Sequence, residues 1–139
     1  MEYTSVESNR DFFDEIVRLQ IELWNYVDER VASAHPIRLG SLGVLRILDA
    51  RGTSRVNDIA EELVITVGGT SKLIDRLEAS GHCIRRANPD DRRSSLIELT
   101  ESGRTILAAA TVDFDAALAD RLGGSADIAD LTERLRALR

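Results

Sequence analysis

The sequence predicts a mainly α-helical fold of the α+β class, in which helices flank one short β-hairpin. Over most of the chain, apolar residues recur at steps of three and four, which places them on one face of a helix. Residues 82–87 and 94–99 look like two strands instead, and Asn88-Pro89-Asp90-Asp91 between them is typical of a turn. Two short helices joined by a tight turn come directly before this hairpin. This order predicts a winged helix-turn-helix with a two-stranded wing, flanked by N- and C-terminal helices.

The N-terminal part of the chain is expected to form two helices. Residues 10–34 form the first, because their apolar side chains share a face and no Gly or Pro interrupts them. His35-Pro36 ends this helix, since the residue before a proline is pushed out of the helical conformation. The second helix is expected over 39–50, with Arg51-Gly52 closing it.

The helix-turn-helix follows a short extended link at 53–55. Its first helix is expected over 56–63, and Val64-Ile65 form the turn. Thr66 is a suitable N-cap for the second helix, because its side chain can accept a hydrogen bond from a free backbone N–H. Ser80-Gly81 ends that helix, where glycine supplies a C-terminal stop.

The C-terminal part is expected to form a long helix capped by Thr100 and a final helix after the Gly123-Gly124 break, with Ser125 as its cap. These helices and the N-terminal one carry more apolar surface than a 139-residue monomer can readily cover, although ordinary core packing is the alternative. We therefore expect residues 10–34 and 100–139 to be dimerisation helices. They flank the winged helix-turn-helix lobe at 39–99, within a single domain spanning 1–139.

The composition is that of one globular domain, with 43% hydrophobic and 30% charged residues in 139. No apolar run approaches the ~20 residues that cross a bilayer, so no membrane association is expected. The N-terminus is acidic and polar, unlike a signal peptide, which predicts a cytoplasmic protein. A single cysteine, Cys83, agrees with a reducing compartment.

The net charge of −6 is unevenly distributed. Residues 66–93 carry a net charge of +2, which leaves −8 on the remainder. The basic residues of this window are Lys72, Arg76, Arg85, Arg86, Arg92 and Arg93. A local basic face on an acidic protein permits binding to nucleic acid phosphates, although it does not demand it.

Three segments in order resemble the MarR family (multiple antibiotic resistance regulators), and the likeness extends from about Leu39 to Gly103. Asp58-Ile59-Ala60-Glu61-Glu62-Leu63 resembles the first helix of the family's helix-turn-helix. The run from Ser71 to Glu78, followed by Gly81, is similar to its recognition helix. Asp91-Arg92-Arg93 and Leu99-Thr100-Glu101-Ser102-Gly103 resemble its wing signature.

The resemblance implies a homodimer that binds a palindromic double-stranded DNA operator. The exposed side of the recognition helix and the wing are expected to contact the DNA through Thr66, Gly68, Gly69, Thr70, Ser71, Lys72, Arg76, Arg92 and Arg93. In the family's pattern Asp91 pairs with Arg93 and stiffens the wing. Gly68-Gly69 depart from the usual polar pair, and we expect them to permit close approach of the backbone to DNA at ~1 kcal/mol of helix propensity each.

The resemblance further implies transcriptional regulation, most often repression, which a small molecule relieves in some members. The family's effector pocket lies between the dimerisation region and the DNA-binding lobe. Trp24, His35, Pro36, Leu39 and Leu42 are candidates for its wall, and each is equally compatible with ordinary packing.

The sequence leaves two alternative functions open. Cys83 makes a redox-responsive regulator an alternative, and a winged helix that binds protein instead of DNA is another. A zinc site is not expected, because only His82, Cys83 and the distant His35 are available. An enzyme is not expected either, since the chain lacks a Gly-rich phosphate loop and has only two histidines that could act as bases near neutral pH. No cofactor is expected.

Overall fold

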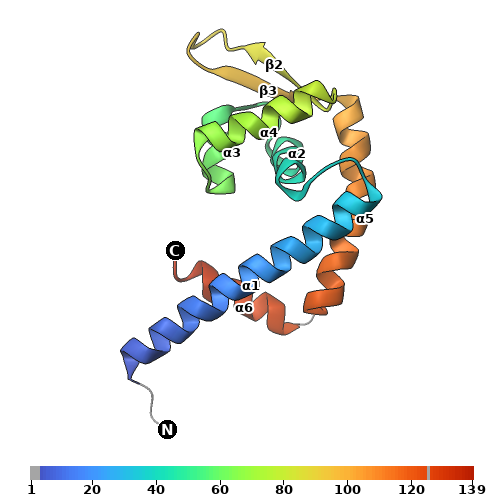
Figure 1. Cartoon of the computed structure of the whole chain (residues 1–139). Helices are drawn as coiled ribbons and strands as arrows, with labels where there is room; N and C mark the ends of the chain where they lie inside the picture. Colours follow the sequence, from blue (N-terminus) through green and yellow to red (C-terminus); the bar gives the residue numbers. More distant parts are fainter. Residues whose placement is uncertain (1–3, 125) are drawn as a thin grey trace.

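The computed structural model describes residues 4–124 and 126–139 (Figure 1). In chain order its elements are α1 (Ser5–Ala34), α2 (Leu39–Arg51), β1 (Ser54–Arg55), α3 (Val56–Leu63), α4 (Val67–Ala79), β2 (Cys83–Ala87), β3 (Ser95–Leu99), α5 (Glu101–Leu122) and α6 (Ala126–Arg136). The β2–β3 hairpin lies at the opposite end of the molecule from the N-terminus (Figure 1). None of the helices in the described part is long and apolar enough to cross a membrane. The mainly α-helical class with a winged helix-turn-helix is confirmed.

The sheet has three strands in the order β1-β3-β2, so the predicted two-stranded wing is joined by a third strand that was not predicted. β2 pairs with β3 as the expected antiparallel hairpin, from Cys83 opposite Leu99 to Ala87 opposite Ser95. Ser54 and Arg55, expected as an extended link, pair with Ile97 and Leu96 on the other edge of β3. Two residues are too few to show strand alternation in a sequence, and only the tertiary pairing makes them a strand.

The first helix begins at Ser5, five residues before the predicted start at Arg10. Thr4 and Glu7 form a capping box: the Glu7 N–H donates to Thr4 Oγ1 at 3.2 Å, and the Thr4 N–H donates to Glu7 Oε2 at 2.9 Å. These hydrogen bonds lower the pKa of Glu7. The Thr-x-x-Glu pattern was therefore the signal for the true start of this helix.

The core is organised around α2, which packs against α1, α3, α4, α5 and β3. Its Leu42, Leu45 and Leu48 are almost wholly buried, together with Ile74 of α4 and Ile97 of β3. A helix surrounded in this way couples the helix-turn-helix to the long terminal helices, because both sets of elements contact the same apolar side chains.

Thr100 and Gly103 attach α5 to the winged lobe. Thr100 caps α5 by accepting a hydrogen bond from the Gly103 N–H at 3.0 Å, as predicted, and its own hydroxyl donates to the Gly81 carbonyl at 2.6 Å. A Cβ on Gly103 would lie 2.1 Å from the His82 carbonyl oxygen. Glycine is therefore required where α5 crosses the end of α4.

The last helix, α6, buries none of its residues within the described part of the chain. Ser125, expected to cap it, lies outside the described residues. The break before α6 agrees with the prediction, because Gly123 and Gly124 both have positive φ angles, of 73° and 64°.

Candidate nucleic-acid interface

The recognition helix α4 is fixed at its start by Thr66, which accepts a hydrogen bond from the Gly69 N–H at 3.0 Å and so acts as the predicted N-cap. Ile74 and Leu77 are buried on its inner face. Gly68 and Lys72 are exposed on the opposite side. The N-terminal half of the helix therefore exposes small and polar residues together with the apolar Val67, and Lys72 is its one cation.

Thr70 is a correction to the predicted site. Its side chain is fully buried, and its hydroxyl donates to the Thr66 carbonyl at 2.9 Å. It lies on the same helical stripe as Ile74 and Leu77, one and two turns before them. Thr70 therefore packs inward and does not belong to the exposed face on which the sequence analysis placed it.

Arg85 of β2 fastens the wing to the recognition helix, a role that the sequence analysis did not assign. Its guanidinium lies 2.7 Å from Asp75 Oδ1 and 3.2 Å from Glu78 Oε1, and it also donates to the Ser71 carbonyl at 3.3 Å. The Arg85 backbone N–H donates to Glu78 Oε2 at 2.8 Å. Opposite charges in the two segments were visible in the sequence, but their pairing depends on how the hairpin packs on α4.

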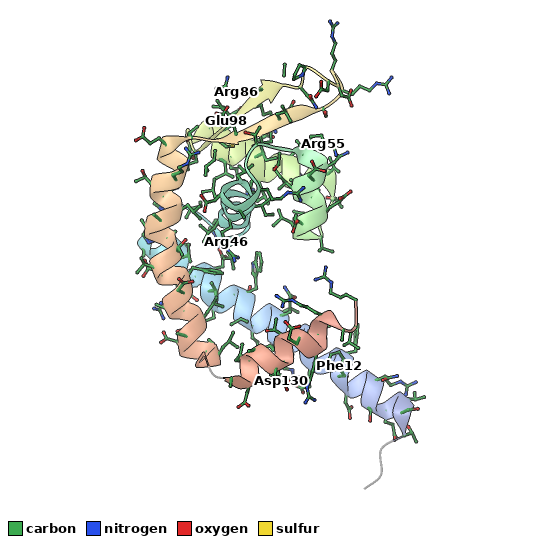
Figure 2. The ribbon with its side chains drawn as sticks, turned by 180° about the vertical axis from the view of Figure 1, so that it is seen from behind. Phe12, Arg46, Arg55, Arg86, Glu98 and Asp130 are labelled. Carbon is green, nitrogen blue, oxygen red and sulfur yellow. The ribbon has the colours of Figure 1, made fainter. Side chains whose placement is uncertain are left out.

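A second ion pair neutralises another cation of the basic segment at residues 66–93. Arg86 pairs with Glu98 across the hairpin, and Figure 2 shows both side chains at β2 and β3. In the described part of the chain, no carboxylate pairs with the remaining four basic residues of the window, which are Lys72, Arg76, Arg92 and Arg93.

The loop of the hairpin is built by Asn88 and Asp91. Asn88 is buried, and its side-chain oxygen accepts a hydrogen bond from the Asp90 N–H at 3.0 Å. Asp91 Oδ1 accepts one from the backbone N–H of Arg93 at 2.9 Å. The expected pairing of Asp91 with Arg93 thus runs through the backbone, and both Arg92 and Arg93 keep exposed side chains. Figure 2 shows long nitrogen-tipped side chains leaving this loop and pointing away from the body.

The predicted effector residues divide between different places. Trp24 and Leu39 line a cavity of about 300 Å³ between α1, α2, α3 and α5. Arg46 of α2 is the only charged residue of its wall, and the guanidinium lies 4.7 Å from the centre of the Phe114 ring. Figure 2 labels Arg46 on the side of α2 that faces α1 and α5.

His35 and Leu42 are corrections to that predicted pocket. His35 and Pro36 line a separate cavity of about 270 Å³ beside the C-terminal half of α4, which Arg76 also borders. His35 Nε2 lies 2.6 Å from Asp113 Oδ2 and so ties the end of α1 to α5. Leu42 has no exposed surface, because it faces the core around α2.

Cys83 is fully buried at the start of β2, and burial raises the pKa of its thiol to about 11. A thiol held neutral and out of contact with solvent is a poor nucleophile, which disfavours the redox alternative. Within residues 4–124 and 126–139, no three or more His, Cys, Asp or Glu side chains gather where they could hold a metal ion.

The MarR family model matches residues 37–95, which span the whole helix-turn-helix and most of the hairpin. A curated relative, the HTH-type transcriptional regulator YfiV of Bacillus subtilis, is 43% identical over 63 residues, or 45% of this chain. Over its winged helix-turn-helix the chain is therefore similar to the MarR family. The aligned part is 39% of the length of YfiV, so this chain spans less than half of that relative.

Solved structures extend the likeness in fold over the whole chain. The transcriptional regulator BldR from Sulfolobus solfataricus aligns with a TM-score of 0.90 at 18% identity, covering 98% of this chain and 97% of BldR. The repressor CouR bound to a 23-mer DNA duplex aligns with a TM-score of 0.79 at 27% identity, covering 100% of both chains. CouR from Rhodococcus jostii RHA1 is also solved with p-coumaroyl-CoA.

Proposed function

We propose that this chain is a transcriptional regulator of the MarR family that binds double-stranded DNA with α4 and the β2–β3 hairpin. The observation that carries the proposal is the separation of the basic residues into two groups. Arg85 and Arg86 form ion pairs with carboxylates. The other four basic residues expose unpaired charges on α4 and the hairpin loop, and they are Lys72, Arg76, Arg92 and Arg93. CouR, which aligns over its whole length, was solved with DNA and supports this assignment.

Each part of the interface has a proposed task. The start of α4 enters the major groove, where Thr66, Gly68, Gly69, Ser71 and Lys72 face the bases and the adjacent phosphates. The hairpin loop reaches the neighbouring backbone or minor groove, where the negative potential favours arginine. Arg92 and Arg93 supply that contact, and Asp91 stabilises the loop that carries them.

Binding of duplexes selected from a random pool tests the proposal, measured by fluorescence anisotropy at several salt concentrations. The Arg92→Ala variant should reduce the log–log salt slope by about one, because one phosphate contact is lost. Arg18→Ala, on α1 and away from the hairpin, is the matched control and should leave the slope unchanged. Failure to bind any selected duplex would favour the alternative of a winged helix that binds protein.

We infer that the active form is a homodimer built from the terminal helices. α6 buries nothing within the described chain, and large apolar side chains of α1 and α6 are exposed, among them Phe13 and Leu131 at 64% and 53%. A second copy would cover this surface. Two-fold symmetry then predicts a palindromic operator with half-sites about one helical turn apart, the arrangement of a repressor that occludes a promoter.

We further propose that the cavity beside Trp24 and Arg46 receives a small-molecule effector. Its walls are mainly apolar, and Arg46 offers one cation to an acidic group. CouR, solved with p-coumaroyl-CoA, is a relative that binds a ligand with an aromatic acyl group. Occupancy would change the packing of α1 and α5 on α2, and so the separation of the two recognition helices in a dimer.

Trp24 makes this effector proposal directly testable. It is the only tryptophan of the chain and it lines the cavity, so its fluorescence should respond to a bound ligand. Titration with a set of aromatic and aliphatic carboxylates should give saturable quenching for at least one of them. Arg46→Gln should weaken that ligand about tenfold or more, whereas equal affinity in the variant would remove Arg46 from the site.

A further inference from the structure

Gly68 has no reason in the fold to be glycine. A Cβ at this position would meet no atom within 4 Å, and the residue lies in the first turn of α4. Gly69 differs, because a Cβ there would lie 3.1 Å from Thr66 Oγ1, the atom that caps the helix. The cap therefore explains Gly69, while nothing in the chain explains the loss of helix propensity at Gly68.

Three of the four residues just before this glycine are apolar and exposed. Val64, Ile65 and Val67 are 80%, 44% and 48% exposed, and they surround the cap residue Thr66. Val64 also has a φ of 57° and is the only non-glycine residue of the described chain with a positive φ. A β-branched residue adopts this backbone conformation only at a cost in free energy. A turn with Gly or Asn would be more stable and more soluble, so neither stability nor solubility accounts for this patch.

The apolar patch lies at the start of the recognition helix. The Ile65 Cδ1 atom is 3.9 Å from the position of a Cβ on Gly69, so the Ile65 side chain lies beside that glycine. The Thr66 hydroxyl already accepts the Gly69 N–H, and the exposed Lys72 follows on the same helix. The end of α4 that would enter a major groove therefore presents methyl groups around a flat glycine surface.

One group on the major-groove edge of B-DNA is apolar, the C5-methyl of thymine. We propose that Val67 and Ile65 read thymine through contacts with this methyl group, and that Gly68 lets the base edge come close enough for them to touch it. The inference rests on the proposed function and adds its base specificity. The neighbouring free cation on Lys72 favours DNA over an apolar protein partner as the occupant of the patch.

Replacement of thymine by uracil removes only this methyl group and so tests the proposal. A duplex selected from a random pool is resynthesised with deoxyuridine at one thymine position at a time. The unmodified protein should lose about fourfold in affinity at one or more positions, the equivalent of one methyl group removed from the contact. Val67→Ala, at an exposed position where alanine favours the helix, should bind the thymine and uracil duplexes equally at those positions.

Lys72→Ala is the control, because it should weaken binding to both duplexes by the same factor and keep the fourfold thymine preference. A protein that binds its selected duplex with no uracil penalty at any position overturns the thymine readout and leaves the proposed function standing. A protein that selects no duplex overturns both. A thymine preference that survives Val67→Ala and Ile65→Ala together assigns the methyl contact to other residues and also overturns the inference.

Discussion

At the residue scale, Gly103 and Gly68 stand in helices for different reasons. Gly103 sits where the start of α5 crosses the His82 carbonyl, and its hydrogen is the largest substituent that fits. Gly68 faces open space. The same substitution should therefore have opposite effects at the two positions.

Gly103→Ala should lower the free energy of unfolding by about 3 kcal/mol or more, because the Cβ would force α5 away from β2. Gly68→Ala should raise it by about 0.5–1 kcal/mol, the difference in helix propensity. Thermal unfolding followed by circular dichroism measures both. Equal effects of the two substitutions would contradict this account of their surroundings.

Because the thiol of Cys83 is buried, the free energy of unfolding should depend on pH in the alkaline range. Its pKa is raised from 9.0 to about 11 in the folded chain, so between about pH 9 and 11 the unfolded thiol ionises while the folded one stays neutral. The unfolded state then binds fewer protons, and stability falls as the pH rises, by an amount of the order of 2 kcal/mol. Below pH 9 this contribution is constant.

Denaturant unfolding of the unmodified protein and Cys83→Ala at pH 8 and pH 10.5 isolates this effect. The difference in stability between the two pH values should be smaller in the variant, which has no thiol. In the native protein at pH 8, a maleimide should react with Cys83 far more slowly than in denaturant. Rapid labelling of the folded chain would restore the redox alternative.

At the element scale, α4 and the hairpin behave as one unit because Arg85 joins them. The guanidinium is 26% exposed and holds Asp75 and Glu78 at once, which is a stronger arrangement than a solvated surface pair. The hairpin also contacts β1, α2 and α3 through β3. Arg85 adds the ionic link between β2 and the recognition helix.

Arg85→Met keeps most of the apolar stem and removes the charge. It should cost about 1–2 kcal/mol of stability and speed amide hydrogen exchange in β2 more than in α2. Arg86→Met, which breaks only the cross-strand pair with Glu98, is the matched control and should cost less than 1 kcal/mol. Similar losses for both variants would show that Arg85 holds nothing beyond its own strand.

The N-cap of α4 is a second device at this scale. Thr66→Ala should cost about 1 kcal/mol, since the Gly69 N–H loses its acceptor, whereas Thr66→Ser keeps the hydroxyl and should change stability little. Equilibrium unfolding in urea measures both variants. Because Gly68 and Gly69 give the first turn little propensity of its own, a loss well under 0.5 kcal/mol for the alanine variant would show that the cap is unimportant.

At the scale of the whole molecule, the proposed homodimer depends on the exposed apolar surface of the terminal helices. Phe13 is 64% exposed in the single chain, so Phe13→Glu should leave the fold intact and shift the protein toward a monomer. Sedimentation velocity measures the mass. Lys72→Glu introduces an acid in the DNA-binding lobe and should leave the dimer unchanged. A Phe13→Glu protein that keeps the dimer mass would place the interface elsewhere.

The local sequence was most informative where a backbone conformation depends on neighbouring residues. The Thr66 and Thr100 caps and the glycine break at 123–124 follow from side chains a few residues apart, and all appear in the structure. The start of α1 was missed only because the Thr4 and Glu7 pattern was not read as a capping box.

What the sequence by itself determined is the order of elements, the helix-turn-helix with its hairpin, and the basic segment between Thr66 and Arg93. Hydrophobic periodicity, caps and turns are local properties, so the sequence reveals them directly. The tertiary structure decided that Thr70 and Leu42 are buried in the core. It also decided that His35 and Trp24 line different cavities. Finally, it decided that Arg85 forms ion pairs with carboxylates whereas the side chain of Arg92 is exposed and unpaired in the described chain. Those outcomes depend on which distant groups meet across α2 and the hairpin, and burial and charge pairing exist only once the chain is folded.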